Sequence, residues 1–196
     1  MKNPIFIVNT HPGENPAFVE PLERFLLSLG IKPQIIAHYQ DRVSFSPLPS
    51  RVFLTGVPME VTYSLSQPET QERVERVFAW LKDCPCPVLG ICFGHQILGQ
   101  VFGGKVSSLE KSVVDERYPL AIEIQAGIFT KVNRLQVFAE HRDYVSRVPE
   151  GFQVLSSVGK VPYILYHPER EFYGMQFVPE QSDEGTKAIL KRFVES

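Results

Sequence analysis

The chain has 196 residues, 43% of them hydrophobic and 21% charged, which is the balance of a globular domain and excludes a disordered or fibrous chain. Its 20 basic and 22 acidic residues leave a formal net charge of −2, so we expect neither a nucleic acid nor an anionic membrane surface as a partner. Three cysteines are an odd number, which argues against the disulfide framework of a secreted domain and favours a reducing, cytoplasmic compartment.

The first half of the chain alternates predicted strands and helices. The strands are short apolar runs of the kind buried in parallel sheets, at Ile5–Val8, Gln34–Ala37, Arg51–Leu54 and Val88–Ile91. Apolar residues on one face indicate the first helix: Phe18, Leu22, Phe25, Leu26 and Leu29. We expect it to begin near Pro21 and to end with Gly30 just beyond its last turn.

A second helix is predicted between the third and fourth strands. Ser66 and Glu69 have the spacing of a capping box, which predicts the helix start. Its apolar face contains Val74, Val77, Phe78 and Leu81, and Pro85 and Pro87 should end it.

The second half contains closely spaced short strands and one helix. The predicted strands are Leu120–Ile124, Leu135–Ala139, Phe152–Ser156, Val161–Tyr166 and Phe172–Phe177. The last helix runs from Ser182 or Asp183 to the end of the chain. We therefore predict one α/β domain over residues 1–196. Its architecture is three-layered and flavodoxin-like, an open, mostly parallel sheet with helices on both faces and a small antiparallel extension.

Gly90-Ile91-Cys92-Phe93-Gly94 joins the fourth strand to the next helix. A cysteine between two glycines at such a turn is the counterpart of a nucleophile elbow, in which small residues allow the backbone to turn sharply. At a helix N-terminus we expect Cys92 to be stabilised as a thiolate.

Cys84 and Cys86 have neither zinc-ligand nor Cys-x-x-Cys spacing and are predicted to be inert. No zinc cluster or dinucleotide fingerprint is present in the sequence. Gly99–Lys105 has the Gly-x₄-Gly-Lys spacing of a phosphate loop, but Val106 stands where that loop needs serine or threonine. We expect neither a metal nor a cofactor.

These motifs resemble the class I glutamine amidotransferases, and the layout is most similar to the separate amidotransferase subunit of GMP synthetases. The resemblance rests on four segments: Val88–Val106 around the cysteine, Leu54–Pro58, Glu140–Val145, and Tyr173–Glu180, which reads Tyr-Gly-Met-Gln-Phe-Val-Pro-Glu.

The resemblance implies a Cys-His-Glu triad that hydrolyses L-glutamine to glutamate and ammonia. Cys92 would form the thioester, and Glu180 would orient the histidine that moves the protons. Backbone N–H groups of Phe93 and of the Gly56-Val57 loop would hold the oxyanion. Gln96 and the His141 segment would help to bind glutamine or a related small molecule. Because 196 residues match the size of the amidotransferase module alone, a separate synthetase subunit is the expected partner; a homo-oligomer is left open.

The expected histidine is absent, because Val178 stands at its position. His167 lies in a similar Tyr-His-Pro-Glu string, but it precedes the matching strand and is interpreted as a surface histidine. Two more departures surround the same site. Val57 replaces a glycine, and its Cβ is expected to hinder the loop N–H. Glu140 replaces a serine and places a carboxylate near that of the ligand.

Three functions follow as alternatives. The first is a degenerate, non-catalytic relative that binds a ligand or regulates a partner. The second is a working glutaminase subunit with an unusual base, and the third is a divergent cysteine hydrolase that uses Cys92. An engineered substitution at a catalytic residue usually introduces alanine, asparagine or glutamine rather than valine. Together with the departures at Val57 and Glu140, this favours natural divergence at Val178.

Overall fold

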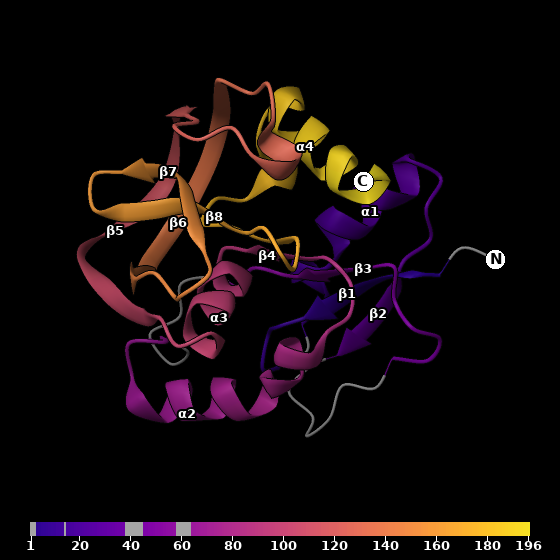
Figure 1. Ribbon diagram of the computed structural model, residues 1–196, viewed down its shortest axis with the longest axis horizontal. Helices are drawn as coiled ribbons and strands as arrows, with labels where there is room; N and C mark the ends of the chain where they lie inside the picture. Colours follow the sequence, from indigo (N-terminus) through magenta and orange to yellow (C-terminus); the bar gives the residue numbers. More distant parts are fainter. Residues whose placement is uncertain (1–2, 14, 38–44, 58–63) are drawn as a thin grey trace.

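The computed structural model describes residues 3–13, 15–37, 45–57 and 64–196, and it is built around a seven-stranded sheet (Figure 1). The strands follow the order β2(Gln34–Ala37), β1(Ile5–Asn9), β3(Arg51–Leu54), β4(Val88–Ile91), β9(Phe172–Met175), β8(Val161–His167) and β7(Gln153–Val158). The first five strands in this order, β2, β1, β3, β4 and β9, pair in parallel. The strand β8 pairs antiparallel with both β9 and β7. The predicted mostly parallel sheet with an antiparallel extension is therefore confirmed.

Helices cover both faces of this sheet because side chains along each strand point alternately to the two sides. On β1, Ile5 and Ile7 belong to a core shared with α1(Glu20–Ser28) and α4(Glu184–Glu195), whereas Phe6 and Val8 belong to a core shared with α2(Pro68–Val77) and α3(Phe93–Val101). The two pairs of helices accordingly lie on opposite sides of the sheet in Figure 1.

Local sequence signals set the ends of two helices as predicted. Gly30 has φ +75°, and the N–H of Ile31 donates to the Leu26 carbonyl at 3.0 Å, which is a Schellman motif ending α1. At α4, the Asp183 side chain accepts from the Thr186 N–H at 2.8 Å as an N-cap. Phe18 departs from the prediction, because it lies in a separate 3₁₀ turn, Pro16–Phe18, before α1.

The predicted capping box of α2 is wrong. The helix begins at Pro68 with Gln67 as its N-cap, and no side chain caps it. The Ser66 hydroxyl instead bonds to the hydroxyls of Ser64 at 2.6 Å and Ser108 at 2.9 Å. The helix also ends earlier than expected, at Val77, and a 3₁₀ segment, Ala79–Asp83, continues toward the prolines.

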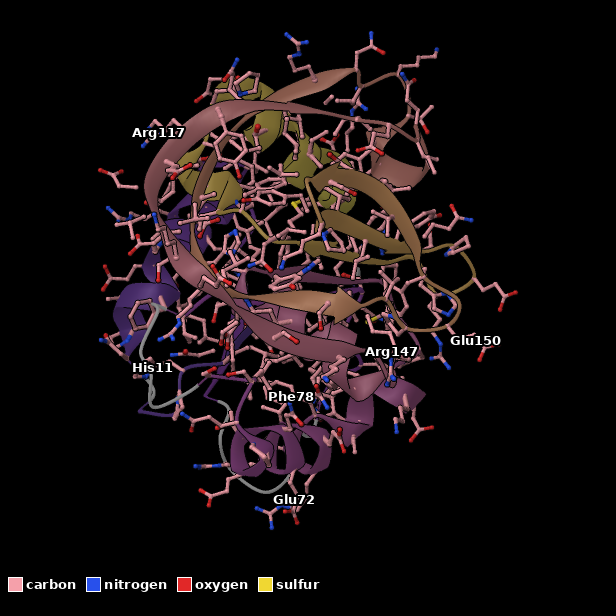
Figure 2. The ribbon with its side chains drawn as sticks, turned by 90° about the vertical axis from the view of Figure 1, so that its left-hand side faces the viewer. His11, Glu72, Phe78, Arg117, Arg147 and Glu150 are labelled. Atoms are coloured by element: carbon pink, nitrogen blue, oxygen red, sulfur yellow. The ribbon has the colours of Figure 1, made fainter. Side chains whose placement is uncertain are left out.

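The strand predicted at 135–139 is part of a much longer ribbon, whereas of the strand predicted at 120–124 only Leu120 and Ala121 belong to it. β5(Lys105–Ala121) and β6(Arg134–Arg147) pair antiparallel as a separate two-stranded sheet. Figure 2 faces this ribbon, with Arg147 at one end and Arg117 farther along it. Most of β5 is exposed or half-buried and its register shifts, so it lacks the apolar alternation that would predict a strand.

The remaining described elements are short 3₁₀ turns at Gly127–Phe129 and Pro179–Gln181. In the part of the chain that the structure describes, every helix is too short or too polar to cross a bilayer.

Candidate active site

Cys92 occupies the predicted tight turn between β4 and α3. Its backbone has φ +50° and ψ −100°, a left-handed conformation that is unusual for a residue with a side chain. Its N–H donates to the Met175 carbonyl at 2.7 Å, which ties the turn to β9. A Cβ on Gly94 would lie 2.6 Å from the Leu54 carbonyl oxygen, and one on Gly90 would collide with Gly94. Both glycines are therefore required by close backbone packing.

The environment of the Cys92 thiol opposes ionisation. The Sγ lies 3.6 Å from the Glu140 carbonyl oxygen and 3.9 Å from Gln176 Nε2. Burial raises the pKa of Cys92 to about 12; the Phe93 backbone N–H lowers it, and the carboxylates of Glu180, Glu140 and Asp143 add to the rise. The expected stabilisation of a thiolate is thus wrong for this structure, because desolvation outweighs the helix N-terminus.

A cavity of about 130 Å³ adjoins Cys92. It brings together five of the predicted site residues: Gly56, Val57, Cys92, Val178 and Glu180. Glu140 also lines it, together with Ala17, Phe18, Pro21, Ile91, Phe138 and Gln181. Small-molecule sites usually measure roughly 300–1,000 Å³, so this cavity is small. The oxyanion segment is described only to Val57, since Pro58 lies outside the described residues.

Glu180 lines the cavity without an ionic or hydrogen-bonding partner for one of its oxygens. It lies in the turn Pro179–Gln181, and its Oε2 is buried with no bond to any described residue. Burial raises the pKa of this carboxyl to about 7, although its own backbone N–H acts in the opposite direction. The Glu180 carboxyl therefore lines the cavity with one oxygen buried and without a bond to a described residue.

Val178 is firmly held at the expected histidine position. Its N–H donates to the Phe138 carbonyl at 2.9 Å, and its own carbonyl accepts from the Ser182 hydroxyl at 2.8 Å. Among the described residues that line the cavity there is no histidine, lysine or arginine. The cavity therefore has a thiol and two carboxylates but no imidazole.

Gln96 and His141 stabilise β6 and do not line the cavity. Gln96 Nε2 donates to the Asp143 carbonyl at 2.8 Å, and that carbonyl also lies 3.2 Å from His141 Nδ1. His141 Nε2 bonds to the Tyr163 hydroxyl at 2.9 Å. Burial lowers the pKa of His141 to about 4, outweighing the Asp143 carbonyl, so this ring is neutral at pH 7.

None of the other described histidines lines the cavity, although His11 stacks on Phe18, which does line it, with ring centroids 4.9 Å apart. His95 is fully buried, and burial lowers its pKa to about 3, outweighing the adjacent Gly174 backbone, which raises it. His167 pairs with Phe172, which pairs with Val88 at the start of β4, whereas Cys92 follows the end of that strand. His167 is half-buried against Phe152, with ring centroids 5.0 Å apart. Its interpretation as a surface residue is therefore only partly right.

The sequence reasoning missed two polar residues of this region. The buried Gln176 side chain connects Cys92 Sγ, at 3.9 Å, to Gln96, at 3.5 Å. The Asp143 carboxylate accepts from Ser64 and Ser108, both at 2.6 Å. Both residues lie in segments that carry the family resemblance, so the resemblance is the sequence signal that could have pointed to them.

The family model described as "Glutamine amidotransferase class-I" matches residues 15–196. The chain belongs to the class I glutamine amidotransferase family. This class I amidotransferase is 33% identical over 156 residues to the GMP synthase [glutamine-hydrolyzing] of Brucella melitensis, covering 74% of this chain and 28% of the relative. The enzyme of the same name from Clostridium novyi is 31% identical over 134 residues, 67% of this chain and 24% of the relative. The chain thus spans about a quarter of the length of these relatives.

Solved structures with this fold include other amidotransferase-like chains. A candidate GMP synthase subunit from Thermoplasma acidophilum superposes with a TM-score of 0.80 at 21% identity, covering 100% of this chain and 94% of that one. PurLQS from Thermotoga maritima has a TM-score of 0.71 at 14% identity, covering 99% of both chains. The predicted family and flavodoxin-like fold are confirmed.

No metal site accompanies the described part of this class I amidotransferase, where no group of three or more His, Cys, Asp or Glu side chains is placed to hold an ion. The groups available at the cavity are therefore the Cys92 thiol, the Glu180 and Glu140 carboxyls and backbone N–H donors.

Proposed function

We propose that this class I glutamine amidotransferase domain binds L-glutamine or a related small molecule, has lost most of its glutamine hydrolysis, and has a binding or regulatory role. The observation that carries the proposal is that Val178, rather than an imidazole, lines the cavity with Cys92 and Glu180. Cys92 and Glu180 are the retained members of the triad in this proposal.

Proton transfer is the step that the valine removes. Attack by Cys92 on the carboxamide carbon forms a thioester only if the thiol loses its proton and the departing ammonia gains one. Because burial raises the pKa of Cys92, the free thiolate is a minor species at pH 7. A valine side chain neither accepts nor donates a proton. Glutamine turnover should therefore be slow.

The oxyanion side of the site supports a family-type pocket. A Cβ added to Gly56 would lie 3.2 Å from the Cys92 Cβ, so this loop closely approaches the proposed nucleophile. We propose that Gly56, Val57 and the Phe93 N–H form the oxyanion region, as the family resemblance implies. Glu140 lines the cavity as well, and its negative charge would oppose binding of a ligand carboxylate nearby.

The proposed partner is a separate polypeptide with synthetase chemistry. The curated relatives are named GMP synthase [glutamine-hydrolyzing], and the matched part is 28% or 24% of their length. A partner of this class would receive ammonia from an active domain or be regulated by an inactive one.

Two other functions have specific observations in their favour. The retained Cys92 turn and Glu180 favour a glutaminase that the partner activates by supplying or repositioning a base. The strained Cys92 backbone, with φ +50°, favours a nucleophilic cysteine, and the carboxylate of Glu140 in the cavity favours a cysteine hydrolase whose substrate is not glutamine.

Glutamate release from glutamine, measured with and without a GMP synthetase-type partner, tests these alternatives. We expect negligible release from the native chain and an increase of at least about 100-fold in Val178→His, since general acid–base assistance is worth 10²–10⁴-fold. Val178→Ala is the matched control, because it opens space without adding a base and should give no gain. Cys92→Ser in the Val178→His background should abolish the increase.

Rapid release by the native chain would overturn the loss of hydrolysis. Labelling of Cys92 by a glutamine-like electrophile, blocked by excess glutamine, is expected if the cavity accepts glutamine. If neither binding nor labelling is seen and Val178→His gains nothing, the glutamine-binding proposal fails and a different substrate is favoured.

A further inference from the structure

Cys84 and Cys86 form a close thiol pair outside the candidate active site. They lie between the 3₁₀ segment Ala79–Asp83 and β4, so they precede the strand that Cys92 follows. Their Sγ atoms are 3.7 Å apart, and neither is in a disulfide. Neither of these two thiols takes part in the proposed amidotransferase chemistry.

The backbone between the two cysteines holds the thiols in this proximity. Cys84 is extended, with φ −65° and ψ 120°, as expected for a residue before proline. Pro85 fixes its own φ and limits the freedom of the short segment. A disulfide requires about 2.05 Å between the sulfur atoms, so the Sγ atoms need to approach by about 1.7 Å for the bond to form.

The surroundings make the two thiols unequal. The Arg170 Nη1 donates to the Lys82 carbonyl at 2.9 Å, which holds this guanidinium beside the segment. The hydrogen bonds with Cys86 lower the pKa of Cys84, and the positive charge of Arg170 lowers it further. Burial of Cys84 acts in the opposite direction but is the smaller effect. The Cys84 contact and burial raise the pKa of Cys86. The lowered pKa of Cys84 favours it as the attacking thiol, and Cys86, whose sulfur is 3.7 Å away, lies close enough to resolve the mixed disulfide.

We propose that Cys84 and Cys86 are a redox-active dithiol that a low-molecular-weight disulfide oxidises to an intrachain disulfide. Both residues are buried, with 8% and 7% of their surface exposed, so the oxidant reaches the pair only when the segment opens locally. The pair provides two sulfur ligands, whereas a structural zinc site needs four ligands, and no larger ligand group surrounds it among the described residues. Oxidation is therefore favoured over metal binding.

The exchange takes place in two balanced steps. The Cys84 thiolate attacks one sulfur of the oxidant, forming a mixed disulfide and releasing one reduced thiolate, which takes up a proton. Cys86 then loses its proton and attacks the Cys84 sulfur, forming the Cys84–Cys86 bond and releasing the second reduced thiol. Two protein thiols are oxidised and one small disulfide is reduced to two thiols. Because the ring closed by two nearby cysteines is small and strained, dithiothreitol should reverse the reaction readily.

Thiol counting on the full chain tests the proposal. The protein is incubated with oxidised glutathione, unfolded in denaturant and titrated, and its intact mass is measured. We expect the three cysteines to give one free thiol and a mass lower by about 2 Da, without a glutathione adduct. In Cys92→Ser, which leaves the pair intact, no free thiol should remain.

The single variants Cys84→Ser and Cys86→Ser separate ring closure from simple thiol reactivity. In each, the remaining partner should be unable to form the intrachain bond, and at most a glutathione adduct should form. Circular dichroism checks that they are folded. Three free thiols after oxidation of the native chain, or loss of thiols only as glutathione adducts, would overturn the proposal. Glutamine hydrolysis does not enter these measurements, so their result is independent of the proposed function.

Discussion

At the scale of single residues, Val178 changes the chemistry of Glu180. A carboxylate beside an imidazole would be stabilised as an anion, whereas the Glu180 Oε2 is buried without a partner. Burial raises its pKa from 4.5 to about 7. Between these values the folded protein holds a proton that the unfolded chain has lost, so ionisation of Glu180 reduces stability as the pH rises.

Glu180→Gln should therefore stabilise the protein at pH 8 and have little effect at pH 4. The upper limit of the gain is about 3.5 kcal/mol, from a rise of about 2.5 pKa units at about 1.4 kcal/mol each. The free energy of urea unfolding at both pH values measures it. An equal change at both would mean that removal of the charge is not the cause.

At the scale of elements, side-chain capping differs between α4 and α2. Asp183 caps α4 through the Thr186 N–H at 2.8 Å, and this bond satisfies a backbone donor that has no partner within the helix. Ser66 has the sequence signature of a cap, but Gln67 is the N-cap of α2 and makes no side-chain bond to the helix. Similar local patterns thus have different structural roles.

Asp183→Ala should cost about 1 kcal/mol of unfolding free energy, the usual value of an N-cap. Ser66→Ala is the matched comparison and should cost less than about 0.5 kcal/mol, since it removes surface hydroxyl contacts only. Urea or thermal denaturation of both variants measures the difference. Equal losses would restore the capping box as the correct interpretation of Ser66.

At the scale of the whole molecule, burial of two histidines makes the fold sensitive to acid. Burial lowers the pKa of His95 to about 3 and that of His141 to about 4. Below pH 6.5 the unfolded chain gains protons at His95 and His141 that the folded protein does not accept, and the pKa of His167, which burial lowers, acts in the same direction. Stability therefore falls with decreasing pH. The proton that folded Glu180 retains between pH 4.5 and about 7 opposes this trend.

We expect the free energy of unfolding to decrease between pH 6 and pH 5, and to decrease more steeply in Glu180→Gln. At pH 5, His95, His141 and Glu180 together give the native chain a difference of about one proton between its folded and unfolded states. His95 and His141 give the variant about two, so the slopes are roughly 1.4 and 2.7 kcal/mol per pH unit. Urea unfolding across this range measures both slopes. If the variant has the shallower slope, Glu180 does not retain its proton in the folded state.

Local sequence patterns were sufficient for those elements whose causes are local. The apolar runs of β1, β3 and β4, the left-handed Gly30 after α1 and the Asp183 cap depend on residues close to one another in the chain. The glycines around Cys92 likewise predicted its turn. The family and the fold class followed from these signals and from the motifs that carry the resemblance.

The tertiary structure decided the features that depend on distant segments. Ser66 bonds to Ser108 across 42 residues, and β5 is ordered by pairing with β6 although its own pattern is not that of a buried strand. The thiol pKa of Cys92 depends on burial and on carboxylates brought near it by folding. The sequence alone determined that a cysteine stands at a sharp turn opposite a valine where a histidine was expected. Only the fold determined that this thiol is desolvated, because desolvation depends on which segments pack around it.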